Sequence, residues 1–408
     1  MTKQTTKDWM FVKLGEACEI IMGQSPPSSS YNTQGMGLPF FQGKAEFTNL
    51  HPIVEKWCIA PNKIAEPNDI LLSVRAPVGA TNIANQKCCI GRGLAAIRFK
   101  NYKYAFYFLR SIQHKLDSQG TGTTFRAISG EKIRETIFPF PPFSTQIAIV
   151  SKIEELFSVL DKGIENLRLA QQQLKTYRQS TLSAGTSGLL TGTNNFYLNS
   201  ITIGVPAKEN NNWKVVKLID VAKLESGHTP RKDTPAYWEN GNVLWLSLQD
   251  IRALDGKIAI DTKYKTNELG IENSSARLLP EGTVCFCRDI SVGFVTIMGK
   301  PMSTTQHFAN WICTEELDNK FLMYSFMASR DSLIRQGQGT TVKTIYMPEL
   351  KEMRIHLPPK EEQRKIVEVI ESRLSVADKM EESIDKSLQQ AEVLRQSILK
   401  KAFEGKLI

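Results

Sequence analysis

Two stretches of the chain place apolar residues at the spacing of a coiled-coil helix. From Ile149 to Thr181, alternating steps of four and three residues fall on Ile, Ile, Leu, Leu, Gly, Leu, Ala, Leu, Tyr and Thr. The second stretch has Ile or Ala at every seventh position across 370–398, with Met380 and Leu394 at the companion positions. This heptad pattern predicts two long helices.

Small residues recur along both stretches, at Gly163, Ala170, Ala377 and Ala391. Small side chains let two helix backbones approach closely, so the simplest prediction is that the two helices pack on one another. Helices of roughly 40 residues would each be about 60 Å long. The alternative is that each helix packs only on the sheet of its own domain.

The chain repeats itself. The segment 141–149, with its Pro pair, Gln and Ile, matches 358–366 at a shift of 217 residues, and 119–128 matches 336–345 at the same shift. Near the start of each copy, Trp9 matches Trp213 at a shift of 204, so the second copy contains 13 additional residues. Two modules with a shared scaffold and different variable parts are the expected result.

The segment between the copies is rich in Gly, Thr, Asn and Ser, as linkers are. The sequence therefore predicts the order module, long helix, linker, module, long helix. The predicted boundaries are 1–142 for the first module, 143–184 for the central helix, 185–212 for the linker, 213–358 for the second module and 359–408 for the C-terminal helix.

Charge and composition narrow the class of protein. A content of 41% apolar residues is enough for buried cores, and a net charge of +9 suggests a polyanionic partner. Residues 1–142 carry 17 basic and 10 acidic side chains, whereas 208–358 carry 19 and 18, so contact with a polyanion should depend most on the first module. Seven Cys without zinc-type spacing indicate reduced thiols, and the absence of an apolar run of 18 residues leads us to expect a cytoplasmic protein.

No set of residues typical of catalysis is visible. The sequence has no Walker loop, no Gly-rich methyl-donor loop and no Asp- or Asn-Pro-Pro-aromatic segment, and its five His are scattered without metal-ligand spacing. We therefore expect no enzymatic activity, no metal and no cofactor bound by this chain.

What recurs in both copies is polar, Gly-flanked and basic. Residues 120–124, Gly-Thr-Gly-Thr-Thr, precede Arg126, and residues 337–341, Gly-Gln-Gly-Thr-Thr, precede Lys343. Exposed backbone N–H groups, Thr hydroxyls and a cation suit a DNA phosphate or a base edge, although a turn required by the fold would look the same.

Two further loops have suitable side chains. The loop 75–79 is matched by 288–293, and Arg92, between two Gly, is matched by Gln306. Arg and Gln read guanine and adenine edges through paired hydrogen bonds. The predicted DNA-binding residues are Arg75, Arg92, Thr123, Thr124, Arg126, Arg288, Gln306, Thr340, Thr341 and Lys343.

This arrangement resembles the specificity subunit of type I restriction-modification systems. The resemblance covers essentially the whole chain and is carried best by 357–366, by 402–407, by the openings 12–15 and 216–219, and by the paired Gly-Thr-Thr segments. The central copy departs from the pattern, with Thr145 where Glu362 stands and 185–187 where Ala-Phe-Glu stands at 402–404.

The resemblance implies an α+β fold with two target recognition domains and two long helices in an antiparallel coiled coil. Each domain would read one half of a bipartite site in double-stranded DNA. The helices would set the gap and dock two modification subunits, which bring S-adenosylmethionine and methylate adenine before restriction subunits join. Residues implied in partner binding are Gln146, Ile149, Gln363, Ile366 and Phe403.

Two other classes of protein are compared with this one. A self-contained restriction enzyme is disfavoured because the motifs for methyl transfer and cleavage are missing. A non-catalytic coiled-coil adaptor with two ligand-binding modules would have the same skeleton, and DNA binding distinguishes it from a specificity subunit.

Overall fold

The computed structural model describes residues 9–121, 126–192, 200–204, 213–339 and 343–408. Four predicted DNA contacts, Thr123, Thr124, Thr340 and Thr341, lie outside the described residues. The chain divides into two compact units. Unit 1 comprises Met1–Arg168 and Asp385–Ile408, and unit 2 comprises Leu169–Ile384. Each unit combines sheets with helices, which confirms the predicted α+β class.

The main sheet of unit 1 has the strand order β2-β10-β7-β8, all antiparallel. Alternate residues of β7 face opposite cores: Ile70 and Leu72 pack with the helices, and Leu71 packs with the second sheet. All four residues of β7 are buried because both faces of the sheet are covered. The bounds are β2 Glu19–Met22, β7 Ile70–Ser73, β8 Thr81–Ile83 and β10 Leu94–Arg98.

The remaining elements of unit 1 surround this sheet. A second sheet has the order β3-β5-β4-β9-β6, and β1 pairs with β11. Their bounds are β1 Met10–Lys13, β3 Tyr31–Asn32, β4 Leu38–Phe41, β5 Trp57–Cys58, β6 Ile64–Ala65, β9 Cys88–Ile90 and β11 Ile137–Phe140. The short helices are α1 Leu14–Ala17, η2 Ser28–Ser30, η3 Lys44–Glu46, α2 Tyr102–Ser111, α3 Gln113–Gln119 and α4 Gly130–Arg134.

Unit 2 repeats the main sheet in the order β14-β21-β18-β19, extended by β16. Smaller sheets have the orders β17-β15-β20 and β12-β22-β13. The strands are β12 Ile201–Ile203, β13 Lys214–Lys217, β14 Ala222–Ser226, β15 Val243–Leu246, β16 Ile258–Ala259, β17 Tyr264–Thr266, β18 Val284–Cys287, β19 Val295–Met298, β20 Ser303–Thr304, β21 Phe308–Cys313 and β22 Met353–Leu357. The helices are η4 Leu189–Thr191, α6 Leu218–Val221, η5 Pro235–Tyr237, α7 Leu248–Ala253, α8 Glu268–Glu272, α9 Asn319–Gln336 and α10 Met347–Lys351.

The range 185–212, predicted as a linker, contains a strand of unit 2. Strand β12 lies within it and pairs antiparallel with β22, with Ile201 opposite Ile355. Ile201 is fully buried in the core of unit 2, and its alternation with Thr202 and Ile203 suits a strand. This part of the range therefore belongs to the second domain.

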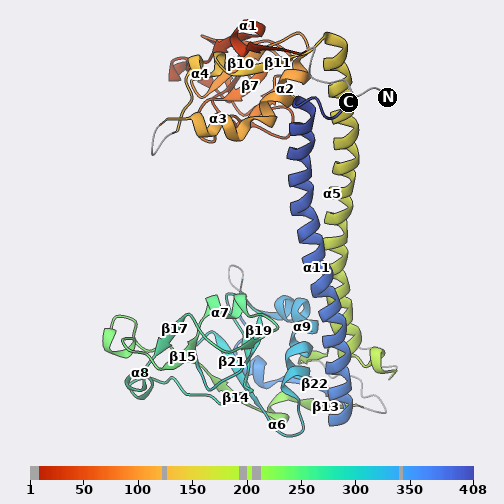
Figure 1. Cartoon of the computed structure of the whole chain (residues 1–408). Coiled ribbons are helices and arrows are strands. Elements are labelled where there is room, and N and C mark those ends of the chain that lie inside the picture. The colour runs from red at the N-terminus through yellow and green to blue at the C-terminus, as the bar shows by residue number, and fades with distance from the viewer. Residues whose placement is uncertain (1–8, 122–125, 193–199, 205–212, 340–342) are drawn as a thin grey trace. The chain divides into compact units, whose positions relative to one another are not determined.

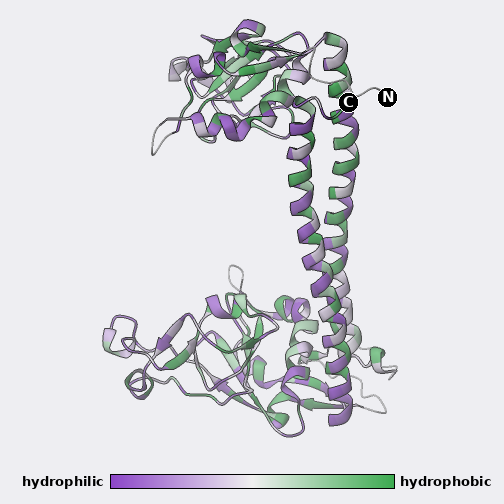
Figure 2. Cartoon of the chain, in the orientation of Figure 1, coloured by the Kyte–Doolittle hydropathy of each residue, from purple (hydrophilic) through white to green (hydrophobic). Residues whose placement is uncertain are grey.

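Two long helices complete the fold, α5 Phe143–Thr186 and α11 Lys360–Phe403. Each has 44 residues, and they begin 217 residues apart, as the internal repeat predicts. In each unit the two run antiparallel, since α5 begins in unit 1 and ends in unit 2 while α11 does the reverse (Figure 1). Hydrophobic and hydrophilic positions alternate along both helices (Figure 2). The predicted antiparallel coiled coil is confirmed.

The helices also pack on the domain cores, so the two alternatives considered for them both occur. In unit 1, Ile149 and Ile153 of α5 are buried in the core together with α2. Farther along α5, Asp161 forms an ion pair with Arg395 of α11. The first turns of α5 thus pack on the domain, and the following turns pack on the other helix.

The contact line between the helices differs in detail from the predicted heptads. Ala377 and Ala391 are buried, as predicted, but Met380 and Leu394 are 53% and 50% exposed. Gly163 is exposed as well, and an added Cβ there would have no atom within 4 Å. The α11 residues that contact α5 are instead one position later, at Glu381 and Arg395. Each of these side chains forms an ion pair with a charged residue of α5.

These charged partners explain the wrong assignment. Arg178 Nη1 lies 2.6 Å from Asp378 Oδ1, and Arg178 Nη2 lies 2.8 Å from Glu381 Oε2. A search for apolar positions favours Met380 and Leu394 over their charged neighbours. Charges that pair across a helix contact are stable there without an apolar side chain.

Candidate nucleic-acid interface

Three loops of unit 1 meet beside the end of β7. The N–H of Val74 donates to the carbonyl of Gly93 at 2.9 Å, and the N–H of Ile128 donates to the carbonyl of Val74 at 3.0 Å. A β-bridge also joins Arg75 to Ala127. These backbone contacts bring together the loops that carry Arg75, Arg92 and Arg126, which the sequence predicted separately.

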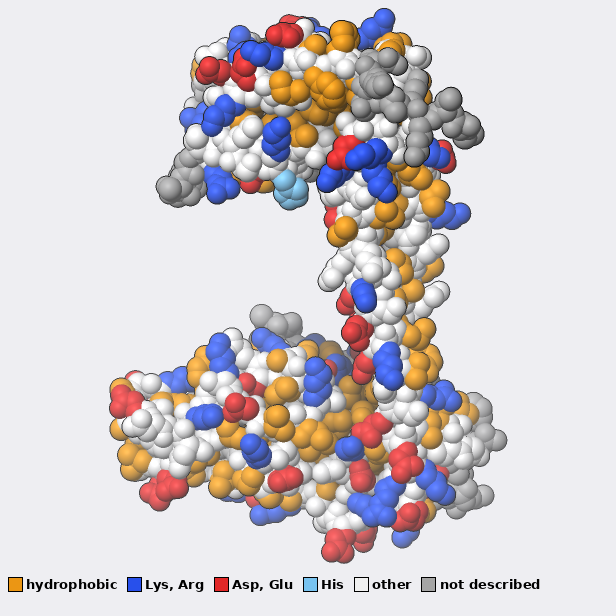
Figure 3. Space-filling model, in the orientation of Figure 1, with side chains coloured by type: hydrophobic (Ala, Val, Ile, Leu, Met, Phe, Trp, Pro, Cys, Tyr) orange, Lys and Arg blue, Asp and Glu red, His pale blue; other side chains and the backbone are white. Residues whose placement is uncertain are grey.

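The three Arg side chains of these loops are exposed. Arg126 Nη1 lies 3.6 Å from Asp117 Oδ2, and the Arg126 side chain remains 55% accessible. The backbone N–H of Arg92 donates to Ser25 Oγ at 3.2 Å, which adds the loop after β2 to the cluster. Figure 3 shows one face of the molecule, on which Lys and Arg side chains are spread over unit 1. A polyanion can therefore approach several cations at this edge.

The corresponding loops of unit 2 are joined in the same way. The N–H of Arg288 donates to the carbonyl of His307 at 3.0 Å, and the N–H of Ile345 donates to the carbonyl of Arg288 at 2.8 Å. A β-bridge joins Asp289 to Thr344. Lys343, in the third loop, is exposed, as its counterpart Arg126 is. Both units therefore build one type of edge from three equivalent loops.

These contacts correct the matching of two residues. By hydrogen bonding, Arg288 takes the place of buried Val74, and Asp289 takes the place of Arg75. The loops correspond at a shift of 214, with Gly79 and Gly293 both at positive φ, 84° and 92°. Matching Arg75 to Arg288 was wrong by one position because it aligned residue type rather than backbone contacts.

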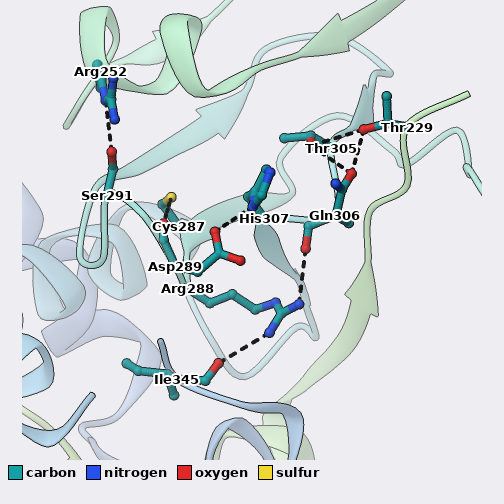
Figure 4. A network of polar contacts seen from close by, with 10 residues as sticks. All are labelled: Thr229, Arg252, Cys287, Arg288, Asp289, Ser291, Thr305, Gln306, His307 and Ile345. Atoms are coloured by element: carbon teal, nitrogen blue, oxygen red, sulfur yellow. Dashed lines mark hydrogen bonds and ion pairs between the residues drawn. The ribbon is translucent and has the colours of Figure 1, made fainter. Parts of the chain in front are cut away.

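Arg288 connects two loops of unit 2 (Figure 4). Its Nη2 donates to the carbonyl of Gln306 at 3.3 Å, and its Nη1 donates to the carbonyl of Ile345 at 3.5 Å. The side chain is half-buried, and no described residue accepts a hydrogen bond from its Nε. Arg288 therefore fixes the backbone beside Lys343 relative to the backbone of Gln306.

Gln306 is exposed and is held by two hydroxyl groups. Thr229 Oγ1 donates to Gln306 Oε1 at 2.5 Å, and Thr305 Oγ1 donates to the same oxygen at 3.0 Å (Figure 4). Thr229 is the counterpart of Ser25, 204 residues earlier, and Gln306 is the counterpart of Arg92. The sequence prediction missed Thr229 and Thr305, although the shift of 204 offered a signal for Thr229.

A second polar pair lies next to Gln306. His307 Nδ1 is 2.6 Å from Asp289 Oδ1. The thiol of Cys287 donates to the carbonyl of Asp289 at 3.1 Å, just as the hydroxyl of Ser73 donates to the carbonyl of Arg75 at 2.9 Å. Burial raises the pKa of Cys287 to about 12, so it remains a neutral donor in this turn.

The residues implied in partner binding lie mostly in the cores. Ile149 and Ile366 are fully buried, and Gln146 and Gln363 are 2% and 0% exposed. Gln146 Nε2 donates to the carbonyl of Pro141 at 3.0 Å, and Gln363 Nε2 donates to the equivalent carbonyl of Pro358 at 2.9 Å. These four side chains stabilise their own unit and have no surface for a partner, which differs from the expectation.

Phe403, the fifth residue of that set, is only partly buried. Its ring packs on Tyr104 and Phe108 of α2, with ring centroids 5.2 and 5.5 Å apart. It therefore fixes the end of α11 to unit 1.

Within the described ranges, no helix is long and apolar enough to cross a membrane. Over the same residues, no cluster of three or more His, Cys, Asp or Glu side chains is placed to hold a metal ion. The polar groups that do cluster are those of the two loop edges.

Comparison with known proteins agrees with this geometry. The family described as "Type I restriction modification DNA specificity domain" matches residues 6–170 and 210–390, one match for each repeat. The chain belongs to this family.

Relatives of these specificity domains match over part or all of the chain. The putative type I restriction enzyme MjaX specificity subunit of Methanocaldococcus jannaschii is 42% identical over 192 residues, which span 46% of this chain and 43% of that protein. The Escherichia coli EcoBI specificity subunit is 20% identical and covers 98% of this chain and 86% of its own length.

Solved structures of specificity subunits share the fold. A chain from a study of the assembly and conformational transition of a type I restriction-modification system has a TM-score of 0.74 at 19% identity, with 98% of both chains covered. The HsdS subunit of Thermoanaerobacter tengcongensis has a TM-score of 0.61 at 20% identity, with both chains fully covered. At these identities the likeness shows the fold alone.

Proposed function

We propose that this chain is the DNA-recognition subunit of a type I restriction-modification complex and that each unit reads one half of a bipartite site. The observation that carries the proposal is the pair of equivalent loop edges. Both place a cation, Arg126 or Lys343, beside positions that differ in chemistry, such as Arg92 and Gln306. Two edges that bind phosphates in the same way but present different side chains to the bases suit two different half-sites.

The proposal assigns two tasks to α5 and α11. They set the gap between the half-sites, and they provide a docking surface for two modification subunits, which restriction subunits then join. Exposed apolar side chains on both helices, among them Val159, Val376 and Leu394, are available for contact with a modification subunit. The chain itself is non-catalytic, and S-adenosylmethionine belongs to the modification subunits.

A domain exchange tests the proposal. Replacing residues 1–142 with the first module of another specificity subunit should change one half of the methylated motif and leave the other half and the gap unchanged. Methylome sequencing of a host that expresses the full complex measures this. A change in both halves would contradict independent reading, and a lack of DNA binding by the unaltered chain, alone and with modification subunits, would favour the adaptor alternative.

A further inference from the structure

We infer that Gln306 acts as a fixed hydrogen-bond donor that selects guanine in the half-site read by unit 2. This inference rests on the proposed function and specifies one contact of it. The usual contact of a Gln side chain, a paired bond with adenine, requires both a free donor and a free acceptor on the amide. The contacts of Gln306 leave only the donor.

The amide oxygen of Gln306 is already saturated. An amide oxygen has two lone pairs, and Oε1 accepts from the hydroxyls of Thr229 and Thr305 at 2.5 and 3.0 Å. No described residue accepts a hydrogen bond from the Nε2 group, and the side chain is exposed. The two N–H bonds of Nε2 are therefore the groups that Gln306 offers to DNA.

Two N–H donors match the guanine edge. In the major groove guanine presents two neighbouring acceptors, N7 and O6, whereas adenine presents one acceptor and one donor. The N6 amino group of adenine would face an oxygen with no lone pair left to accept. Adenine is therefore rejected at this position by an unpaired donor, and guanine is accepted.

The backbone of Gln306 is fixed as firmly as its side chain. Arg288 Nη2 donates to the Gln306 carbonyl, and the backbone of the following residue, His307, is bonded to Arg288 N–H at 3.0 Å. Because both the backbone and the amide group of Gln306 are fixed, the side chain loses little conformational freedom on binding. This favours discrimination between guanine and adenine. In unit 1 the equivalent Arg92 also offers only donors, but its side chain is not tied to Ser25, whose contact is with the Arg92 backbone.

The opposite orientation of the amide makes the opposite prediction. If Nε2 faced the two Thr hydroxyls, Oε1 would point outward and would accept from adenine N6 or cytosine N4. A Glu side chain separates the two cases, because its carboxylate can still accept from both hydroxyls but offers only an acceptor to DNA.

The test uses the full-length chain with the Gln306→Glu substitution and selection from a library of duplex DNA with randomised positions. We expect preference for guanine at one position of one half-site to fall by roughly 10- to 100-fold, as loss of a paired base contact does. An unchanged preference at every position of that half-site would overturn the inference. The half-site read by unit 1 should not change, so it serves as the internal control for folding.

A second pair of variants tests the role of the hydroxyls. The double substitution Thr229→Val with Thr305→Val leaves Oε1 free to accept, so adenine should become nearly as acceptable as guanine at the same position. Thr229→Ser keeps the hydroxyl and should retain the preference for guanine. Persistent rejection of adenine by the double variant would overturn the inference even if the Glu variant failed to fold.

Different results would overturn the proposed function and the inference about guanine. Selection of no sequence at all by the unaltered chain, alone or with modification subunits, would overturn the proposed function. Selection of a bipartite motif that ignores Gln306 would overturn only the inference about guanine.

Discussion

The two units of this chain use the same backbone contacts to present different side chains. Val74 and Arg288 make equivalent pairs of backbone hydrogen bonds, yet one side chain is a buried valine and the other is an arginine that binds two carbonyls. The next position holds Arg75 in unit 1 and Asp289 in unit 2. The comparison teaches that the loop edge is a fixed frame whose side chains can change in charge and size.

The additional residues of unit 2 are confined to a few connecting segments. Between the second sheet and the main sheet, the shift grows from 205 residues at Phe41 and Leu246 to 214 at Ile70 and Val284, and α7 and α8 lie in the longer segment. The shift grows by three more residues, to 217, between the start of β21 and Asp318, the N-cap of α9. The long helices keep their length of 44 residues, and the four shared strands of the main sheet keep their order, so the insertions lie in the connections between these elements.

The largest expected effect comes from lengthening both helices. Inserting seven residues after Ala170 and seven after Ser387, positions 217 apart, adds about 10 Å to each helix and keeps the heptad register. If the units read independently, both half-sites should persist while the gap grows by about three base pairs of ~3.4 Å, and affinity for the original site should fall about 100-fold. Selection from randomised duplex DNA measures both quantities.

The control for this experiment inserts the same heptad into α5 alone. In that variant α5 is seven residues longer than α11, so the two helices cannot pair along their whole length. It should therefore lose binding both to the original site and to the site with the longer gap. An unchanged gap in the double insertion would show that the helices do not set the spacing. A change of the bases themselves would show that the two units are not independent readers.

The next largest expected effect is a loss of stability on replacing one of two buried Gln residues at equivalent positions. Gln363 bonds to three backbone groups, since Nε2 donates to the carbonyls of Glu316 and Pro358 and Oε1 accepts from Asp318 N–H at 2.7 Å. Replacing it with Leu leaves one buried and two partly buried backbone groups without this partner and should lower the stability of unit 2 by about 3 kcal/mol.

The matched change in unit 1 should cost much less. Among the described residues, the side chain of Gln146 bonds only to the carbonyl of Pro141, and its buried Oε1 has no partner. Gln146→Leu should therefore lower stability by about 1 kcal/mol. Hydrogen exchange resolved by peptide measures the two units separately. Equal losses of protection would contradict the difference drawn between them.

The sequence predicted the two long helices and the repeated modules because short local patterns mark both. A Pro pair followed by Gln and Ile marks the start of each helix, and the shift of 217 locates the second copy of that start. Strand β12 was missed because a three-residue strand is too short to show periodicity, and it forms only by pairing with β22.

The candidate site was predictable only in part. Arg92 stands out between two Gly, Arg75 and Arg126 each lie within four residues of a Gly, and backbone contacts do join their loops. Thr229 was missed because its role depends on Gln306, 77 residues later in the chain. Such pairs arise from tertiary contacts between loops, and apart from the repeat that aligns Thr229 with Ser25 the sequence carries no sign of them.

The smallest expected effect concerns Arg126 and Lys343, the cations that both units share. If each binds phosphate, replacing either with Ala should weaken binding to all sequences alike and lower the slope of log K against log salt by about 0.9. Arg126 Nη1 lies 3.6 Å from Asp117 Oδ2, whereas Lys343 is exposed and forms no ion pair with a described residue. Arg126→Ala should therefore weaken binding more than Lys343→Ala, because it leaves the Asp117 carboxylate facing DNA. Adding Asp117→Asn should make the two losses equal, and Arg126→Lys should restore the slope. A loss confined to one base position would identify a base reader, and binding that is unchanged across the salt titration would mean that the Gly-Thr-Thr segments are turns required by the fold.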